Sequence, residues 1–256
     1  MYPVIQISDT LFIPTYFLVI AIGYTVGMYW VLLRSRKYKL NAVFGLDLAF
    51  LIMIFGFLGS RLLHVFWELP EHYLKNPMDI LKVWQGGFVF YGGALFAFVA
   101  SSVWVKLSGE SFYSWSTVYA PVVPLVYGIG RFATLLSGSG FGKPTTSIFG
   151  ITYPPGTEAP FGVSLHPTPV YSMLWSFATV ALLLYLEKTK FNVRAQMFLI
   201  MIAFYGVGRL WLEQLRGDFR GQIVMGLTIS SWISLGLILV SLILILKSYR
   251  KHQYGR

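Results

Sequence analysis

The chain is 256 residues long, with 56% hydrophobic and only 12% charged residues, and long apolar runs recur along its whole length. This composition excludes an ordinary soluble domain and indicates a polytopic membrane protein. In such a chain the net charge of +10 records topology and contact with anionic lipid head groups, so we exclude nucleic acid as a partner. The chain has no cysteine, which excludes a disulfide, a thiolate nucleophile and a cysteine-ligated zinc site.

Apolar runs of about 20 residues predict transmembrane helices. The fold class we expect is an all-α polytopic membrane protein with seven transmembrane helices, in a single domain over residues 1–256. The first run is expected to stay as an anchor, because it is too long for a signal-peptide core and no basic region precedes it. The expected spans are Thr10–Leu33, Val43–Trp67, Phe88–Val105, Ser116–Leu136, Pro167–Leu186, Ala195–Leu212 and Met225–Leu246.

The basic residues in the connections predict the orientation, because Lys and Arg accumulate in cytoplasmic loops. One set of alternate connections holds twelve of them: Arg34, Arg36, Lys37, Lys39, Lys106, Lys188, Lys190, Arg194, Lys247, Arg250, Lys251 and Arg256. The opposite set holds five: Lys75, Lys82, Lys143, Arg216 and Arg220. We therefore expect the N-terminus outside and the C-terminus in the cytoplasm.

The outer connections are then residues 68–87, 137–166 and 213–224. The middle connection is rich in glycine, proline and threonine, and it is long enough to predict a small external cap loop over about residues 137–166. We expect no second domain and no internal repeat.

An arginine and a run of glycines and hydroxyls interrupt the fourth apolar run, between Tyr127 and Gly142. A buried arginine costs at least about 2.5 kcal/mol on membrane-insertion scales, so it normally faces a bundle interior and binds an anion. Arg61 and Arg209 occupy similar glycine-flanked places. With Arg131, the arginine in this stretch, they make three guanidinium groups, which predict a pocket for an anion. The alternative for Arg131 is a structural ion pair or contacts with backbone carbonyls.

Arg209, Glu213 and Arg216 follow one another at i, i+4 and i+7, so they share one helix face near the outer boundary. Mutual neutralisation of Arg209 and Glu213 is the alternative to substrate binding. His166 opens the fifth span, either as a hydrogen-bonded cap or as a functional base. His64 and His72 have no partner at a useful spacing, and we assign them no role.

The stretch Val83–Gly93 places two Gly-Gly pairs around an aromatic strip at the entry to the third span. Paired glycines allow a backbone or a lipid to approach closely. Helix packing through small residues is the alternative that an isolated Gly-Gly pair favours.

These motifs together resemble the bacterial prolipoprotein diacylglyceryl transferase family, nearly from end to end. The matching positions are Tyr16, Gly59-Ser-Arg61, Val83-Trp-Gln-Gly-Gly, Tyr91-Gly-Gly, Gly130-Arg131 leading to Gly142, His166-Pro-Thr with Tyr171, Arg209-x-x-x-Glu213-x-x-Arg216 and Leu227-Thr228. The resemblance implies transfer of the diacylglyceryl group of phosphatidylglycerol to the lipobox cysteine thiol of a preprolipoprotein. It also implies the bacterial cytoplasmic membrane, a site toward the outer leaflet, and neither a cofactor nor a metal.

The resemblance assigns roles to particular positions. Guanidinium groups stabilise charge on a phosphate leaving group, so Arg131 and Arg209 are the catalytic candidates, with Tyr91 and Glu213. The candidate substrate-binding residues are Tyr16, Arg61, Gly92, Gly93, Ser137, Ser139, Gly142, His166 and Arg216. The expected partners are an anionic phospholipid, with phosphatidylglycerol first, and the signal peptide of a preprolipoprotein.

This sequence departs from the family at polar positions. Tyr91 replaces the histidine of the family's His-Gly-Gly, and a phenol is a poorer base than an imidazole. The hydroxyls of Thr134, Ser137 and Ser139 replace two amides and a carboxylate after Arg131. Pro169 and Ser172 stand in place of Gln and Glu. We therefore keep two alternatives: a paralogous lipid transferase with another donor head group or acceptor, and a catalytically silent lipid-binding or partner-binding membrane protein.

Overall fold

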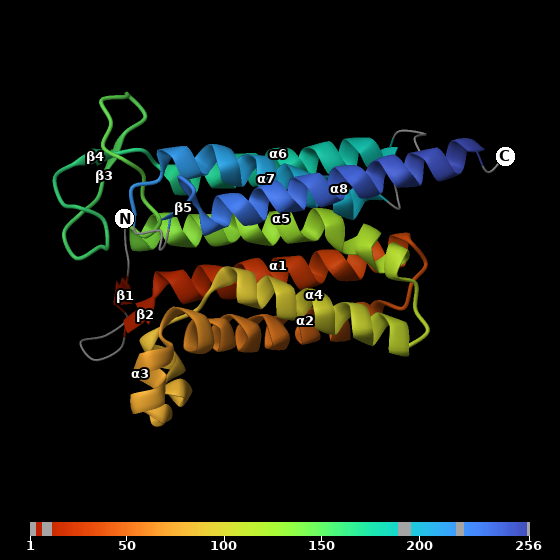
Figure 1. Ribbon diagram of the computed structural model, residues 1–256, viewed down its shortest axis with the longest axis horizontal. Coiled ribbons are helices and arrows are strands. Elements are labelled where there is room, and N and C mark those ends of the chain that lie inside the picture. The colour runs from red at the N-terminus through yellow and green to blue at the C-terminus, as the bar shows by residue number, and fades with distance from the viewer. Residues whose placement is uncertain (1–3, 7–11, 189–195, 219–222, 255–256) are drawn as a thin grey trace. The chain divides into compact units, whose positions relative to one another are not determined.

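The computed structural model describes residues 4–6, 12–188, 196–218 and 223–254. It is mostly helical, with three short two-stranded hairpins (Figure 1). Seven helices of the described chain are long and apolar enough to cross a membrane, which confirms the expected fold class. The Lys190, Arg194, Arg220 and Arg256 used in the charge count, and the expected helix start at Ala195, lie outside the described residues.

The helices and strands follow the chain in an order that matches the predicted spans. The long helices are α1 (Thr15–Lys37), α2 (Ala42–Leu63), α4 (Phe90–Leu107), α5 (Phe112–Ser137), α6 (Thr168–Lys188), α7 (Met197–Leu215) and α8 (Ile229–Tyr254). Short helical turns are η1 (His64–Glu68), α3 (Pro70–Lys75), η2 (Pro77–Leu81) and η3 (Val83–Gln85). The hairpins pair β1 (Val4–Gln6) with β2 (Phe12–Pro14), β3 (Ile151–Thr152) with β4 (Ser164–Leu165), and β5 (Ile223–Val224) with β6 (Leu227–Thr228).

The expected helix starts at Thr10 and Met225 are wrong. Thr10 itself lies outside the described residues, but residues 12–14 form strand β2 and α1 begins only at Thr15. Residues 223–228 form the β5–β6 hairpin, and α8 begins only at Ile229. Met225 and Gly226 both have positive φ, of 50° and 77°, which is a turn conformation that a helix excludes. The apolar run therefore contains a tight turn that hydrophobicity alone does not reveal.

The chain forms two compact units, and each is described by itself. The first comprises residues 1–30 and 116–256, and the second comprises residues 31–115. The single domain expected from the sequence therefore stays a prediction.

In the first unit, α5, α6, α7 and α8 run side by side, and the cap loop lies at the end opposite the C-terminal end of α8 (Figure 1). Ala120, Leu183, Met197 and Met201 form a buried cluster where α5, α6 and α7 meet. Glycines bring neighbouring helices close: a Cβ on Gly206 would lie 3.0 Å from the carbonyl oxygen of Ser234 on α8. Backbone hydrogen bonds also join the segment after α5 to the residues just before α6 and to the end of α7.

In the second unit, α2 and α4 pack closely at glycines. A Cβ on Gly59 would lie 2.6 Å from the carbonyl oxygen of Gly92, and one on Gly92 would lie 2.4 Å from that of Gly59. A Cβ on Gly93 would likewise lie 2.6 Å from the carbonyl oxygen of Gly56. Both Gly92 and Gly93 are buried at this crossing, which is the small-residue helix packing typical of membrane proteins.

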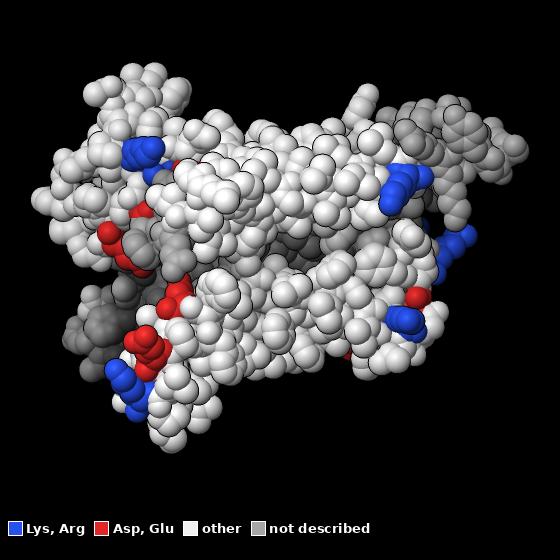
Figure 2. Space-filling view, viewed as in Figure 1, with Lys and Arg blue, Asp and Glu red and all other residues white. Residues whose placement is uncertain are grey.

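The surface between the helix ends is apolar. On the face in Figure 2, the coloured charged side chains gather toward the ends of the long helices, and the length between them is white. Large apolar side chains such as Phe17 and Tyr29 on α1 or Leu95 on α4 are exposed. Soluble monomers rarely expose apolar surface on this scale, whereas lipid-facing helices do so by necessity.

Candidate functional site

Arg131 lies on α5 one helical turn beyond Tyr127, and the two side chains interact. The Nη2 group of Arg131 donates a hydrogen bond of 2.5 Å to the Tyr127 hydroxyl. The guanidinium carbon also lies 4.7 Å from the centroid of the Tyr127 ring, which is cation–π geometry. Tyr127 therefore orients Arg131, and no motif in the sequence analysis had assigned it that role.

The rings of Tyr127 on α5 and Tyr205 on α7 meet edge to face, with centroids 5.9 Å apart. Arg131 and Arg209 each follow one of these tyrosines by four residues, which is about one helical turn. The segment that follows α5 also meets the C-terminal end of α7, because the Lys143 amide donates to the Leu215 carbonyl at 2.8 Å. The structure thus places the two arginines on neighbouring helices, one turn beyond the same ring contact and toward the same end.

Beyond α5 the backbone turns back past Arg131. Gly138 and Gly140 have positive φ, a conformation that glycine adopts without strain. A Cβ on Gly140 would lie 3.9 Å from Nη1 of Arg131. The hydroxyls of Ser137 and Ser139 lie 2.9 Å apart in the same turn, so this turn brings both predicted serines next to the Arg131 segment.

Backbone hydrogen bonds join three chain segments at this end of the unit: residues 141–143, His166 and residues 215–217. We call this contact the seam. The Gly142 amide donates to the His166 carbonyl at 2.9 Å, and the His166 amide donates to Lys143 at 3.0 Å. On the other side, Lys143 bonds Leu215 and the Gly217 amide donates to Phe141 at 3.1 Å. Gly142 also forms an antiparallel bridge with Arg216. The predicted residues Gly142, His166 and Arg216 are therefore together, although their separation in sequence is large.

Gly142 must be a glycine in this seam. A Cβ there would lie 2.5 Å from the Cβ of His166 and 2.9 Å from the Leu215 carbonyl oxygen. The imidazole Nδ1 of His166 lies 3.4 Å from the Tyr171 hydroxyl on α6. This is a contact between two side chains, so the capping role, the role as a base and the substrate contact of His166 all stay predictions.

Arg209 and Glu213 form the ion pair that we considered as the alternative to substrate binding. Nη2 of Arg209 lies 3.1 Å from Oε2 of Glu213, with side chains only 15% and 6% exposed. The Thr228 hydroxyl donates to the other carboxylate oxygen, Oε1, at 2.8 Å. Arg216 pairs with Asp218, with its Nε 2.8 Å from Oδ1 and its Nη2 bonded to Oδ2. The roles of Thr228 and Asp218 were not predicted.

Tyr16 stands at the start of α1 in the same unit, where its ring contacts Phe17. Its predicted contact with substrate stays a prediction.

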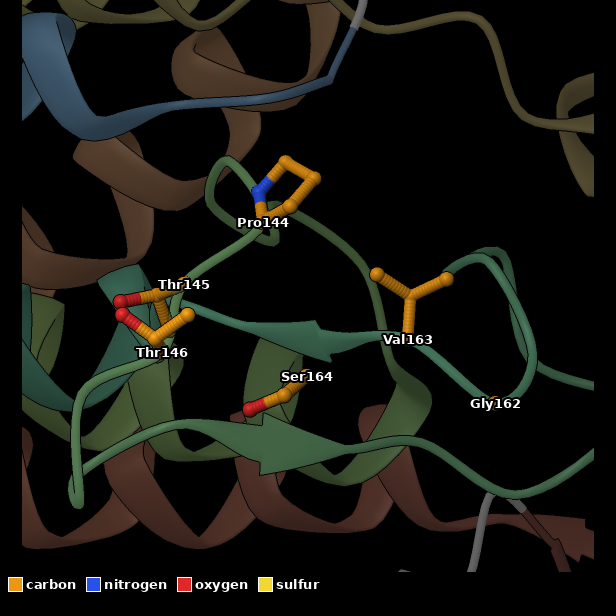
Figure 3. A pocket seen from close by; sticks show the side chains of 6 residues that line it. All are labelled: Pro144, Thr145, Thr146, Gly162, Val163 and Ser164. Atoms are coloured by element: carbon orange, nitrogen blue, oxygen red, sulfur yellow. The ribbon is translucent and has the colours of Figure 1, made fainter.

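A hollow of about 570 Å³ opens in the cap loop (Figure 3). Its lining contains none of the predicted site residues and no charged side chain: Pro144, Thr145, Thr146, Gly162, Val163 and Ser164. An anionic ligand would find no cation among these side chains, so the hollow does not compete with the arginines as the phosphate site.

In the second unit, the Arg61 guanidinium donates hydrogen bonds to four backbone carbonyls. Its Nη2 donates to Asp79 at 2.7 Å, its Nε to Ile80 at 3.2 Å, and its Nη1 to Gly86 at 2.5 Å and Gly87 at 3.2 Å. The guanidinium also lies over the ring of Tyr73, at 5.4 Å. Arg61 therefore holds the connection between α2 and α4, and its predicted contact with substrate stays a prediction.

We expect Arg61→Leu to destabilise the protein by on the order of 3 kcal/mol, because four partly buried carbonyls lose a charged donor. Arg61→Lys should recover only part of this loss, since an ammonium cannot reach all four carbonyls. Thermal unfolding in detergent, followed by tryptophan fluorescence, measures the effect. Arg36→Leu is the control, because Arg36 is exposed at the end of α1. Equal unfolding temperatures for Arg61→Leu and wild type would show that the carbonyl contacts contribute nothing.

The expectation that His64 and His72 have no partner is wrong. His64 Nδ1 lies 2.5 Å from Glu68 Oε2, four residues on, and His72 Nε2 lies 3.1 Å from Asp79 Oδ2. The π-helical turn η1 carries the first pair, and the fold of residues 70–81 creates the second. Asp79 also pairs with Lys82, and the hydrogen bond from Lys82 is the main reason that the Asp79 pKa is lowered.

Tyr91 lies in the first turn of α4, next to Gly92 and Gly93. Its hydroxyl is buried, and no group in the described part of the chain hydrogen-bonds it. Burying an unpaired hydroxyl costs about 1–3 kcal/mol, so such groups usually meet a partner. For Gly92 and Gly93 the structure shows close packing against α2, while their predicted substrate contact stays untested.

The fold and this constellation define a class: a multi-pass membrane protein that carries an arginine on each of two neighbouring long helices, one turn beyond a shared ring contact. Comparison with known proteins gives the family. A family model described as prolipoprotein diacylglyceryl transferase matches residues 3–247. The chain belongs to that family.

Curated relatives agree over nearly the whole chain. The phosphatidylglycerol–prolipoprotein diacylglyceryl transferase of Clostridium tetani is 31% identical over 223 residues, which cover 87% of this chain and 88% of that protein. The protein of the same name from Bacillus cereus is 30% identical over 237 residues, covering 90% of this chain and 86% of its own length.

Proposed function

We propose that this protein transfers the diacylglyceryl group of phosphatidylglycerol to the lipobox cysteine of a prolipoprotein. The observation that carries the proposal is the placement of Arg131 and Arg209 one turn beyond the Tyr127–Tyr205 contact. Family membership supports the same activity, since the curated relatives carry that name. The proposed location is the bacterial cytoplasmic membrane, with the site toward the outer leaflet.

The reaction forms a sulfur–carbon bond and breaks the carbon–oxygen bond between diacylglycerol and phosphate. The acceptor thiol loses its proton, and glycerol phosphate leaves with the bond's electron pair. Negative charge therefore grows on the phosphate oxygens, where two planar guanidinium groups can bind it bidentately. Tyr127 holds the first guanidinium, and Glu213 holds the second, so neither has to be ordered when the lipid arrives.

The test is complementation of a bacterial strain depleted of its own transferase, together with purified protein given labelled phosphatidylglycerol and a lipobox peptide. We expect growth and a peptide heavier by one diacylglyceryl group. A well-expressed protein that binds phosphatidylglycerol but modifies no peptide would favour the paralogous transferase or the silent binding protein. The same outcome would overturn the proposed reaction.

The Tyr91 substitution gives a sharper test of the proton acceptor. Tyr91→His is expected to raise thiol transfer severalfold, because imidazole accepts a proton near neutral pH and phenol does not. Tyr91→Phe removes a hydroxyl without a described partner, so the fold should tolerate it. Transfer assays at constant protein level distinguish the outcomes: loss in both variants would mean that the phenol positions substrate, and no change in either would leave Tyr91 without a functional role.

We propose the orientation that the charge count predicts, with the cap outside and the C-terminus in the cytoplasm. The ends of α5 and α7 and the start of α6 meet in one seam, which supports placing residues 137–166 and 213–224 on the same side. A reporter fused after Arg256 should behave as cytoplasmic, and one inserted at the exposed Gly156 as external. A cytoplasmic signal at Gly156 would reverse the orientation.

A further inference from the structure

The connection between α2 and α4 is folded, and both of its ends lie in membrane spans. The span that contains α2 runs from Ala42 to Glu68, and the next span is Phe90–Leu107. Because successive spans leave and re-enter the membrane at the same face, the connection starts and ends at one membrane boundary. We call residues 66–87, which contain α3, η2 and η3, the boundary arm.

Charged and apolar side chains occupy different sides of the boundary arm. In the 3-10 turn η2, residues three apart share a side, so Met78 and Leu81 lie on one side and Asp79 and Lys82 on another. Asp79 bonds Lys82 at 2.6 Å and His72 at 3.1 Å, which gathers the charges. The segment is therefore amphipathic, although no long helix runs through it.

The apolar side chains of the boundary arm are far more exposed than a water-facing loop requires. Leu74 is 83% exposed and Trp84 is 77% exposed. The other large apolar side chains with at least two thirds of their surface exposed are Phe66, Trp67, Met78 and Leu81. Burying one such side chain is worth about 1.5–3 kcal/mol, so leaving them all in water would be costly.

Arg61 fixes the boundary arm to α2. Four backbone carbonyls, of Asp79, Ile80, Gly86 and Gly87, accept hydrogen bonds from this one guanidinium. Tyr73 of α3 is buried and packs on the guanidinium as well. The arm thus has a fixed shape, and its exposed apolar side is a fixed surface.

We propose that the boundary arm lies in the interfacial zone of the lipid bilayer, with Trp67, Leu74, Met78, Leu81 and Trp84 in contact with lipid. Tryptophans are enriched at this depth because the ring is apolar and the indole N–H is polar. An amphipathic segment lies in the plane of the interface with its apolar side among the acyl chains. Continuity with two spans places the arm at that boundary, and this inference does not depend on the proposed reaction.

The test uses the absence of cysteine, which allows a label at one chosen site. Leu74→Cys, Met78→Cys and Leu81→Cys are each coupled to an environment-sensitive fluorophore, in nanodiscs of phosphatidylcholine with or without a doxyl-labelled lipid. Glu71→Cys, on the same short helix as Leu74, is the matched control, and Glu158→Cys in the cap is a second control. Both control residues are exposed and polar.

We expect doxyl lipid to quench the label at positions 74, 78 and 81 by roughly twofold more than at 158, with position 71 in between. Aqueous iodide should show the reverse order. Strong iodide quenching at 74, 78 and 81, with doxyl quenching no greater than at 158, would overturn the proposal by placing the arm in water. Protection from both quenchers would overturn it too, because protein would then cover the surface.

Discussion

Replacing Arg131 or Arg209 by lysine is expected to reduce diacylglyceryl transfer by roughly 100-fold or more, as loss of one donor to a developing oxyanion typically does. Lysine keeps the positive charge but loses the planar fork that binds two phosphate oxygens at once. In Arg131→Lys the bond to Tyr127 and the cation–π contact are weakened as well. Transfer to a lipobox peptide, measured at saturating phosphatidylglycerol, gives the rate.

Two controls separate this effect from a general loss of charge. Arg36 is exposed in the last turn of α1, and Arg36→Lys should transfer at the wild-type rate. Thermal unfolding of Arg131→Lys should stay close to that of wild type, since the ammonium can still approach the Tyr127 ring. Wild-type rates in both lysine variants would contradict bidentate binding of one phosphate. A loss confined to Arg209→Lys would assign the phosphate to Arg209 alone.

Replacing Glu213 by alanine is expected to destabilise the protein by about 3–5 kcal/mol, the usual result of leaving one member of a buried ion pair alone. The carboxylate is 6% exposed, faces Arg209 at 3.1 Å and accepts the Thr228 hydroxyl at 2.8 Å. Glu213→Gln keeps the shape and the acceptor for Thr228, so it should lose less. Unfolding temperature and folded yield after membrane extraction provide the measurement.

The neighbouring Gln214→Ala is the matched control, because that side chain is exposed on the same turn of α7. Thr228→Val removes the hydroxyl that donates to Glu213 and also accepts the Ser231 amide, and it should cost about 1–3 kcal/mol. If Glu213→Ala folds with wild-type stability but has lost transfer, the carboxylate acts on substrate and the ion pair contributes little to folding. If it loses neither stability nor transfer, both roles are excluded.

The spans were predictable because a membrane demands about 20 apolar residues per helix, and all seven are present in the described chain. The error at Met225 arose because a hairpin turn of two positive-φ residues is as apolar as the helix that follows it. The folded arm after α2 was also hidden, since helices as short as α3 and η2 carry no periodic signal of their own.

The candidate site was predictable where charge stands in an apolar context, as at Arg131, Arg209 and Glu213. Its supporting contacts were not, because they depend on tertiary geometry. Tyr127 is one turn from Arg131, a spacing that could have been noticed, but its contact with Tyr205 joins two helices. His64 shows the converse: its pairing with Glu68 is a simple i, i+4 relation, yet we gave it no role.

The seam that holds Gly142 between His166 and Leu215 limits how far the cap can move. Four described backbone hydrogen bonds tie the strand at residues 141–143 to the start of α6 and the end of α7. Lifting the cap would break these bonds together and would pull on α7, which carries Arg209. We therefore expect the cap to move little relative to α6 and α7. In the proposed reaction, the lipid would then enter and leave between helices, through the plane of the membrane.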